Sequence, residues 1–277
     1  MKVSITTILG LIFSLAMLLT GILSVTGRLE FYELFPFLDN FRSFNLPSLL
    51  IVLGGVLNSM FIMYPGRYVG KAWVSLIHLV TQSKYGPSTL QGDIDQVIQW
   101  SERIQENKTR ASSEIQDENE GEFAGYLFSL VNTKYSTENI RNLSENNIEE
   151  TYTRKMVTVN VLSSMGNSSP AFGMFGTLFG LIVMLGQLDN PAEMGPGLAA
   201  ALITTLYGIS LAHLIFFPLS RKLKNLAQIE RFRDYLIMEG VLLINDDQSS
   251  FFIEDKLNSF LHREMSSDDD SGTKKAA

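Results

Sequence analysis

The chain has 277 residues, of which 45% are hydrophobic and 18% are charged, and its formal net charge is −7. Long windows of the chain contain no charge, which favours a membrane protein over one or two soluble domains. Cysteine is absent, which excludes disulfides, thiolate metal sites and a cysteine nucleophile. The acidic balance argues against a nucleic-acid partner. No nucleotide-binding loop, metal cluster or nucleophile constellation occurs in the sequence, so we expect no enzymatic activity, no metal and no cofactor.

Four apolar windows are long enough to cross a membrane. A helix needs roughly 20 apolar residues to span a hydrocarbon core of about 30 Å. The first window is open to a second interpretation, a cleavable signal peptide. Its apolar run is long for that role, however, and Thr26, Gly27 and Arg28 form a poor cleavage site. We therefore predict transmembrane helices at residues 1–27, 47–66, 169–188 and 198–220.

The basic residues near the ends of these windows predict an orientation. All but two of them fall on one side, and the loop at 189–197 carries no base. The exceptions, Arg28 and Arg42, share the first loop with three acids. We expect periplasmic loops at 28–46 and 189–197, a cytoplasmic domain at 67–165, and a cytoplasmic tail at 221–277 with a disordered end. Both termini are then cytoplasmic, on the side that holds Lys2, Arg67, Lys71, Arg154, Lys155, Arg221, Lys222 and Lys224.

The polar segments have the periodicity of helices and no sustained alternation with a period of two. The prediction is an all-α integral membrane protein with long cytoplasmic helical extensions. The apolar positions that recur at helical spacing include Ile94, Val97, Ile98 and Ile104, then Phe123, Tyr126, Leu127 and Leu130, and near the end Phe252, Ile253, Leu257, Phe260 and Leu261.

The four windows contain no Asp, Glu, Lys or Arg. Ion translocation needs an ionisable or coordinating group at membrane depth, because a bare ion in hydrocarbon is very costly. We therefore expect the chain to be either a scaffold or one wall of a pathway whose carboxylate comes from another chain.

Small residues and prolines set the last two windows apart. Gly173, Gly176, Gly180 and Gly208 allow close helix approach, either within the chain or against a partner helix. Pro170 opens the third window and Pro218 closes the fourth, and each removes one backbone hydrogen bond.

The deepest polar side chains in these windows are Thr177, Thr204 and Thr205. Each hydroxyl can bond back to its own helix, as most membrane threonines do, or face a pore as an oxygen donor. His213 is a candidate proton relay, although a histidine near a helix end is more often an interfacial residue.

Two stretches resemble the MotA/PomA stator family, within the wider MotA/TolQ/ExbB group of ion-driven motors. The first is PAFGMFGTLFGLIVMLGQL from Pro170 to Leu188, and the second is AALITTLYG from Ala200 to Gly208, followed by FFPL from Phe216. The resemblance is continuous over roughly residues 165–225. The order of two spans, a long insert, two spans and a tail is also stator-like. TolQ and ExbB are similar only in part, since they have three spans.

The resemblance implies a homopentameric ring around two helices of a MotB/PomB-like partner, whose aspartate carries the transported Na⁺ or H⁺. It implies that Thr177 and Thr205 line the ion path and that Pro170 and Pro218 couple ion occupancy to movement. The adjacent Thr204 and Thr205 favour sodium, because sodium must replace its water with several oxygen ligands. The implied function is a flagellar stator subunit in the bacterial inner membrane. The alternatives are a TolQ/ExbB-like motor that powers gliding, secretion, defence or an outer-membrane process, and a scaffold that transports nothing.

The chain departs from the family pattern in three places. The stretch expected to contact the rotor lacks the usual glycines, which leaves Arg103, Lys108, Arg110 and Glu114 as candidates. Asn167 replaces the usual acidic residue just before Pro170. The first periplasmic loop is long and rich in aromatic residues, which suggests an interfacial segment; these residues are Phe31, Tyr32, Phe35, Phe37 and Phe41.

Overall fold

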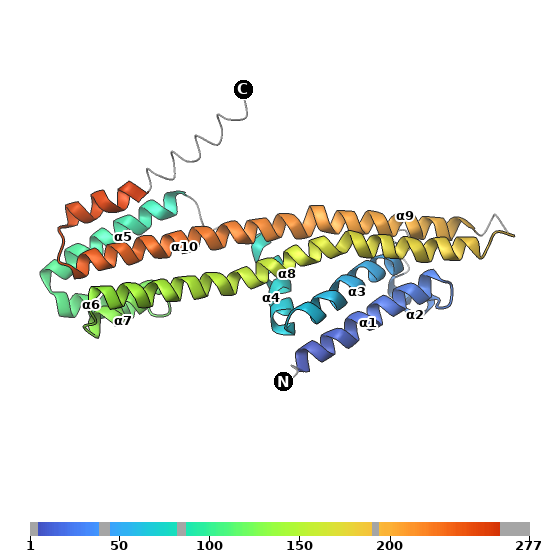
Figure 1. Cartoon of the computed structure of the whole chain (residues 1–277), viewed down its shortest axis with the longest axis horizontal. Helices are drawn as coiled ribbons and strands as arrows, with labels where there is room; N and C mark the ends of the chain where they lie inside the picture. Colours follow the sequence, from blue (N-terminus) through green and yellow to red (C-terminus); the bar gives the residue numbers. More distant parts are fainter. Residues whose placement is uncertain (1–4, 39–44, 82–86, 190–193, 261–277) are drawn as a thin grey trace, which may run out of the picture. The chain divides into compact units, whose positions relative to one another are not determined.

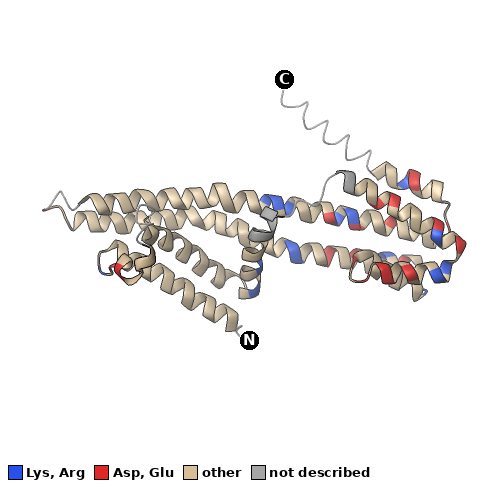
Figure 2. Ribbon diagram, turned by 180° about the vertical axis from the view of Figure 1, so that it is seen from behind, with Lys and Arg blue, Asp and Glu red and all other residues tan. Residues whose placement is uncertain are grey.

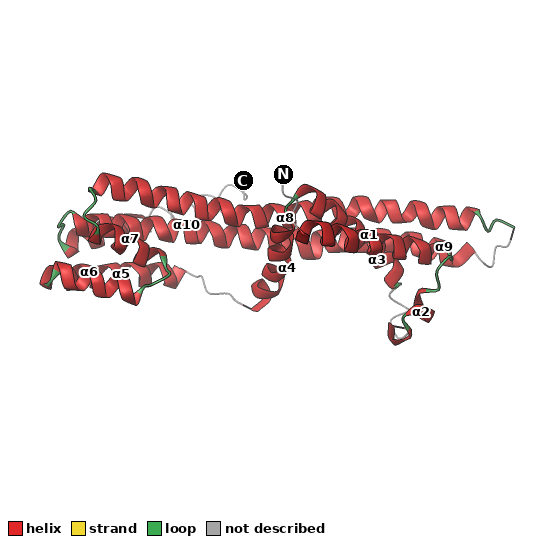
Figure 3. Ribbon diagram, turned by 90° about the horizontal axis from the view of Figure 1, so that it is seen from below, coloured by secondary structure: helices red, strands yellow, loops and turns green. Residues whose placement is uncertain are grey.

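The structure is a computed structural model that describes residues 5–38, 45–81, 87–189 and 194–260. Every regular element in these ranges is a helix (Figure 3). The prediction of an all-α chain is confirmed. The chain divides into two compact units, one made of residues 1–83 and 155–224, and the other of residues 84–154 and 225–277.

The first unit contains the apolar helices. Within the described ranges, four helices are long and apolar enough to cross a membrane: α1 (Ile5–Val25), α3 (Leu46–Met63), α8 (Thr137–Leu185) and the helix Met194–Asn245. The last comprises α9 (Met194–Ser210), η3 (Leu211–Phe216) and α10 (Phe217–Asn245). Their number agrees with the prediction of four spans, whose exact membrane boundaries stay predictions.

Helices α1 and α3 pack closely against each other (Figure 1). A methyl group on Gly54 would lie 2.6 Å from the backbone nitrogen of Leu18, so glycine is needed at this contact. The buried hydroxyl of Ser14 donates to Oδ1 of Asn58 at 3.3 Å. Close backbone contact together with an interhelical hydrogen bond replaces the hydrophobic driving force that lipid does not provide.

The aromatic first loop begins with a short helix, α2 (Phe31–Leu34). Phe31 is buried, and its ring lies 5.4 Å from that of Tyr32 and 5.2 Å from that of Phe35. Phe37 is exposed, and Phe41 lies outside the described residues. The loop therefore starts with a compact aromatic cluster.

The second unit is a helical domain with its own apolar core. It contains α5 (Pro87–Glu106), α6 (Lys108–Glu118), α7 (Phe123–Asn132), the first part of α8, the last part of α10 and a helical segment at residues 250–260. Trp100 packs edge-on against Phe128, with ring centroids 5.4 Å apart. The positions that showed helical spacing in the sequence supply much of this core, among them Ile94, Val97, Ile104, Leu127, Leu130, Ile253 and Leu257.

Candidate ion pathway

The contact between α8 and α9 is made by glycines on both helices. A methyl group on Gly180 would lie 2.7 Å from the carbonyl oxygen of Gly197 and 2.8 Å from the nitrogen of Ala201. A methyl group on Gly208 would lie 2.7 Å from the carbonyl oxygen of Ser169, and one on Gly173 would lie 3.1 Å from that of Thr204. The two backbones are therefore so close that no larger residue fits at these positions.

Thr204 lies inside this contact. Its side chain is fully buried, and a methyl group on Gly176 would lie 2.7 Å from its Cγ2. Its hydroxyl lies 2.9 Å from the carbonyl oxygen of Ala200 and 2.8 Å from that of Ala201, both on its own helix. Within the single chain, Thr204 fills the space that Gly176 leaves.

The other two threonines are half-buried and less constrained. The Thr177 hydroxyl donates to the carbonyl oxygen of Met174 at 2.5 Å. The Thr205 hydroxyl makes no hydrogen bond with any other described residue. Adjacent residues on an α-helix point about 100° apart, so burial of Thr204 turns Thr205 away from the α8–α9 contact. Of the three hydroxyls, that of Thr205 has the greatest freedom to bind an ion or a water molecule.

Pro170 lies inside α8, one turn from the glycine contact. Because proline has no N–H, the carbonyl of Gly166 loses its usual helical donor. The buried Ser169 hydroxyl donates to the neighbouring carbonyl of Met165 at 2.7 Å. A methyl group on Gly166 would lie 2.6 Å from Cε1 of Phe217, so this weakened turn of α8 packs closely against the start of α10.

Pro218 lies two residues after the end of a π-helix, which the sequence analysis did not predict. Residues Leu211–Phe216 form η3, and the N–H of Phe217 donates to the carbonyl of Ala212, five residues earlier. Such turns are rare and occur often at functional sites. The sequence signal for it is Pro218, whose missing N–H makes the regular α-helical pattern harder to maintain at this point. His213 is exposed in this turn, and its ring packs edge-on against Phe217 at 5.4 Å.

The predicted membrane-spanning parts of the apolar helices supply hydroxyl and carbonyl oxygens, but no carboxylate. No Asp or Glu occurs in the described parts of the four apolar windows. Among the described residues, no group of three or more His, Cys, Asp and Glu side chains is arranged to hold a metal ion.

Residues 115–236 match the model of the MotA/TolQ/ExbB proton channel family. The matched range contains the α8–α9 contact, the three threonines and both prolines. Over these residues, which are less than half of the chain, the protein is similar to the MotA/TolQ/ExbB family.

The chain is also similar to proteins that are named PomA and MotA. It is 43% identical to chemotaxis protein PomA of Vibrio alginolyticus, over 37% of this chain and 40% of PomA. The MotAB structure from C. jejuni shares the fold with a TM-score of 0.72 and 24% identity, over 89% of this chain and 95% of that one. The flagellar MotAB stator complex from Bacillus subtilis matches with a TM-score of 0.68 and 25% identity, over 77% and 83% of the two chains.

The candidate rotor residues lie in α5 and α6. Arg103 forms two hydrogen bonds with Glu118, at 2.8 and 3.0 Å, and Arg110 bonds Glu114 at 2.8 Å. The nearby Lys108 pairs with Asp247 at 2.8 Å. Hydrogen bonds from Arg110 and Arg103 lower the pKa of the Glu114 and Glu118 carboxyls respectively. A rotor that bound these exposed residues would have to break these ion pairs and form new ones with the same side chains.

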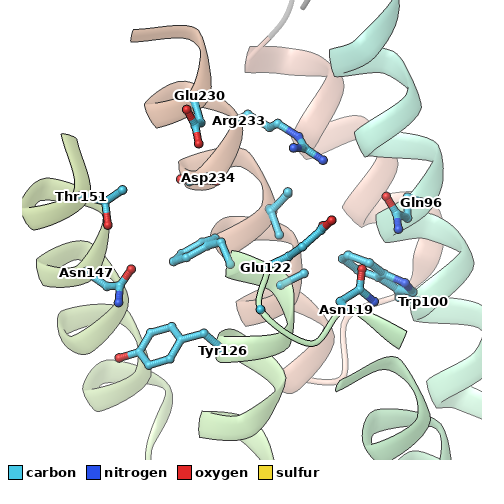
Figure 4. A pocket seen from close by; sticks show the side chains of 14 residues that line it. Gln96, Trp100, Asn119, Glu122, Tyr126, Asn147, Thr151, Glu230, Arg233 and Asp234 are labelled. Carbon is cyan, nitrogen blue, oxygen red and sulfur yellow. The ribbon is translucent and has the colours of Figure 1, made fainter. Parts of the chain in front are cut away.

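The second unit also contains a cavity of about 470 Å³ that the sequence did not reveal. Helices α5, α8 and α10 and the α6–α7 connection contribute its walls (Figure 4). Glu122, Glu230 and Asp234 give it an acidic lining, with Trp100 and Tyr126 beside them. These residues are scattered through the sequence, and only the packing of four segments brings them together.

Proposed function

We propose that this chain is a subunit of an ion-driven flagellar stator that converts cation flow into torque on the rotor. The observation that carries the proposal is the closely packed α8–α9 wall, which presents the free Thr205 hydroxyl but contains no carboxylate. A scaffold would need the glycines but not the hydroxyl, the proline and the π-helix. The match to the flagellar MotAB stator complex of Bacillus subtilis supports the same assignment.

The missing carboxylate defines the partner. We propose a MotB/PomB-like subunit with a single membrane span, whose aspartate binds the ion beside Thr205 and Thr177. Copies of the present chain, five by the resemblance to stators, would surround two such spans. The solved relatives are themselves complexes of MotA with MotB, which supports a heteromeric assembly.

The mechanism follows from the cost of charge in an apolar environment. An ionised aspartate is costly beside the apolar wall, whereas a loaded or protonated one is nearly neutral and can move past it. Each binding or release of the ion would thus change the free energy of the aspartate beside the apolar wall, and hence the position that the aspartate prefers. Pro170 and Pro218, where α8 and α10 lack a backbone hydrogen bond, are the points at which we expect the wall to bend in response.

We propose sodium rather than proton as the transported ion. Sodium needs several oxygen ligands in place of its water, and a free hydroxyl at Thr205 supplies one of them. The Thr204 hydroxyl is bonded within its helix. Its contribution is therefore to hold Thr205 in position. The base-rich ends of the spans further support placement in the inner membrane with both termini in the cytoplasm.

The test is swimming of a bacterium that lacks its own stators and expresses this chain with its single-span partner. We expect Thr205→Ala to abolish or strongly reduce swimming, because the path loses an oxygen ligand. Thr205→Ser should retain most of it. The swimming speed of the wild type should rise with sodium concentration at constant ionic strength.

Thr20→Ala is a matched control, since Thr20 is a span threonine whose hydroxyl bonds its own helix at 2.8 Å. This variant should swim normally. Normal swimming of Thr205→Ala, with membrane levels equal to wild type, would contradict the pathway. A speed independent of sodium would assign the proton instead.

A further inference from the structure

Helix α4 (Gly66–Thr81) leaves the end of a span and turns one face outward. It begins three residues after α3 ends at Met63, so it starts at the boundary of the apolar region. Val69 and Ala72 are fully buried and belong to the same core cluster as Leu162 and Phe216. Burial of this face fixes which side chains of α4 point away from the protein.

The outward face combines bases with large apolar side chains. Arg67 and Lys71 are exposed, one helical turn apart. Val74, which is 55% exposed, follows on the same side, and Trp73, which is 38% exposed, points about 100° away from Val74 at the edge of this face. The Arg67 guanidinium stacks over the ring of Tyr68 at 4.8 Å, and neither base has a carboxylate partner among the described residues.

The first unit carries more bases after its fourth span, and its sequence has no acid on α4 or in the first eight residues of α10. Arg221 and Lys224 are exposed on α10 and form no ion pair with any described residue, while Leu223 between them packs against the same core cluster as α4. In the sequence of this unit, every Asp and Glu lies in the two loops at the other end of the spans, at residues 28–46 and 189–193. Figure 2 shows blue residues without red ones on α4 and at the start of α10.

We propose that α4 and the basic start of α10 form a binding surface for the headgroups of anionic phospholipids. Arg67, Lys71, Arg221 and Lys224 would hold the phosphates, because Lys and Arg beside a span are attracted to an anionic membrane surface. Trp73 and Val74 would enter the interfacial layer, where tryptophan is enriched and amphipathic helices bury their apolar side. An acidic protein would complement the bases but would leave the tryptophan and valine without an apolar environment.

The experiment uses the tryptophan itself as the probe. The sequence contains two tryptophans, Trp73 and Trp100, and the latter is buried in the second unit. A Trp100→Phe variant of the chain, purified with its partner, is reconstituted into vesicles that contain a minority of phosphatidylglycerol in phosphatidylcholine. The acyl chains of one lipid or the other carry bromine, which quenches nearby tryptophan. We expect brominated phosphatidylglycerol to quench Trp73 several-fold more than its share of the lipid predicts.

The same measurement on Arg67→Gln/Lys71→Gln should return quenching to the bulk share of phosphatidylglycerol. Lys134→Gln/Lys256→Gln removes the same charge from the second unit and should quench as wild type. Excess inorganic phosphate should leave the quenching unchanged, because it lacks the chains that Trp73 contacts.

If Trp100→Phe fails to fold, Trp73→Phe in the otherwise unchanged chain supplies the difference signal. Equal quenching by both lipids in proportion to their amounts, or an undiminished preference in Arg67→Gln/Lys71→Gln, would overturn the proposal. The result does not depend on stator activity, because motility enters neither readout.

Discussion

At the scale of single residues, the α8–α9 contact gives two neighbouring threonines different environments. The sequence identified Thr204 and Thr205 as a polar pair, but a pair at adjacent positions cannot face the same way on a helix. Packing against Gly176 buries one hydroxyl and leaves the other half-exposed. The distinction between the buried hydroxyl and the half-exposed one that we propose for the ion path thus comes from a glycine on another helix.

We predict that Gly180→Ala destabilises the folded chain by about 1–3 kcal/mol, the usual cost of overpacking. The added methyl would meet the backbone at Gly197 and Ala201, which cannot move aside as a flexible side chain can. Thermal unfolding of the detergent-solubilised variant, compared with that of the wild type, measures this loss of stability.

Gly92→Ala is the matched change, because nothing lies within 4 Å of a methyl group at this position in α5. Removing a helical glycine there should stabilise the helix by about 0.5–1 kcal/mol. A Gly180→Ala variant as stable as wild type would show that α8 and α9 are not in backbone contact.

At the scale of elements, ion pairs join the helices of the second unit. Asp93 on α5 is 4% exposed and accepts a hydrogen bond from Arg233 on α10 at 2.6 Å. Arg231 on α10 pairs with Glu149 on α8, and Arg141 on α8 pairs with Glu239 on α10. These contacts fix α5, α8 and α10 around the apolar core.

We predict that Arg233→Met destabilises the second unit by about 3 kcal/mol, because it leaves the buried Asp93 carboxylate without its cation. Arg110→Met removes an exposed pair within one helix and should leave the stability almost unchanged, because solvent screens such a pair. The rate of limited proteolysis within residues 84–154, followed by mass spectrometry, compares the two variants. Equal rates would show that the Asp93 pair adds nothing to stability.

Lowering the pH should weaken the exposed ion pairs of α5 and α6. The Glu114 and Glu118 pKa values are lowered by hydrogen bonds from Arg110 and Arg103. Their contribution to stability is therefore present above the ordinary carboxyl pKa and is lost as the pH falls through the lowered values. At neutral pH the pairs do not titrate.

At the scale of the whole molecule, the decisive feature is an absence in the sequence. The apolar windows have no ionisable carboxylate, so in the proposed function the chain supplies a wall and a hydroxyl but not the charged carrier. This is why a partner subunit forms part of the proposed function.

We predict that the chain purified alone and placed in liposomes does not increase sodium or proton flux above that of empty vesicles. Co-reconstitution with the single-span partner should restore flux, and replacing the partner's membrane aspartate with asparagine should remove it again. Dyes inside the vesicles that respond to sodium or to protons measure the two fluxes. Conduction by the chain alone would refute the requirement for a partner.

The sequence by itself determined the helical class, the four apolar helices and the missing carboxylate, because charge-free windows and helical periodicity are local properties that need no knowledge of packing. It also identified Pro170, Pro218 and the glycines. Only the tertiary structure decided that Thr204 is buried while Thr205 is free, that a π-helix precedes Pro218, and that Arg67 and Lys71 share an outward face with Val74. Each of these depends on which face of a helix another segment covers, and that is set by contacts between residues far apart in the chain.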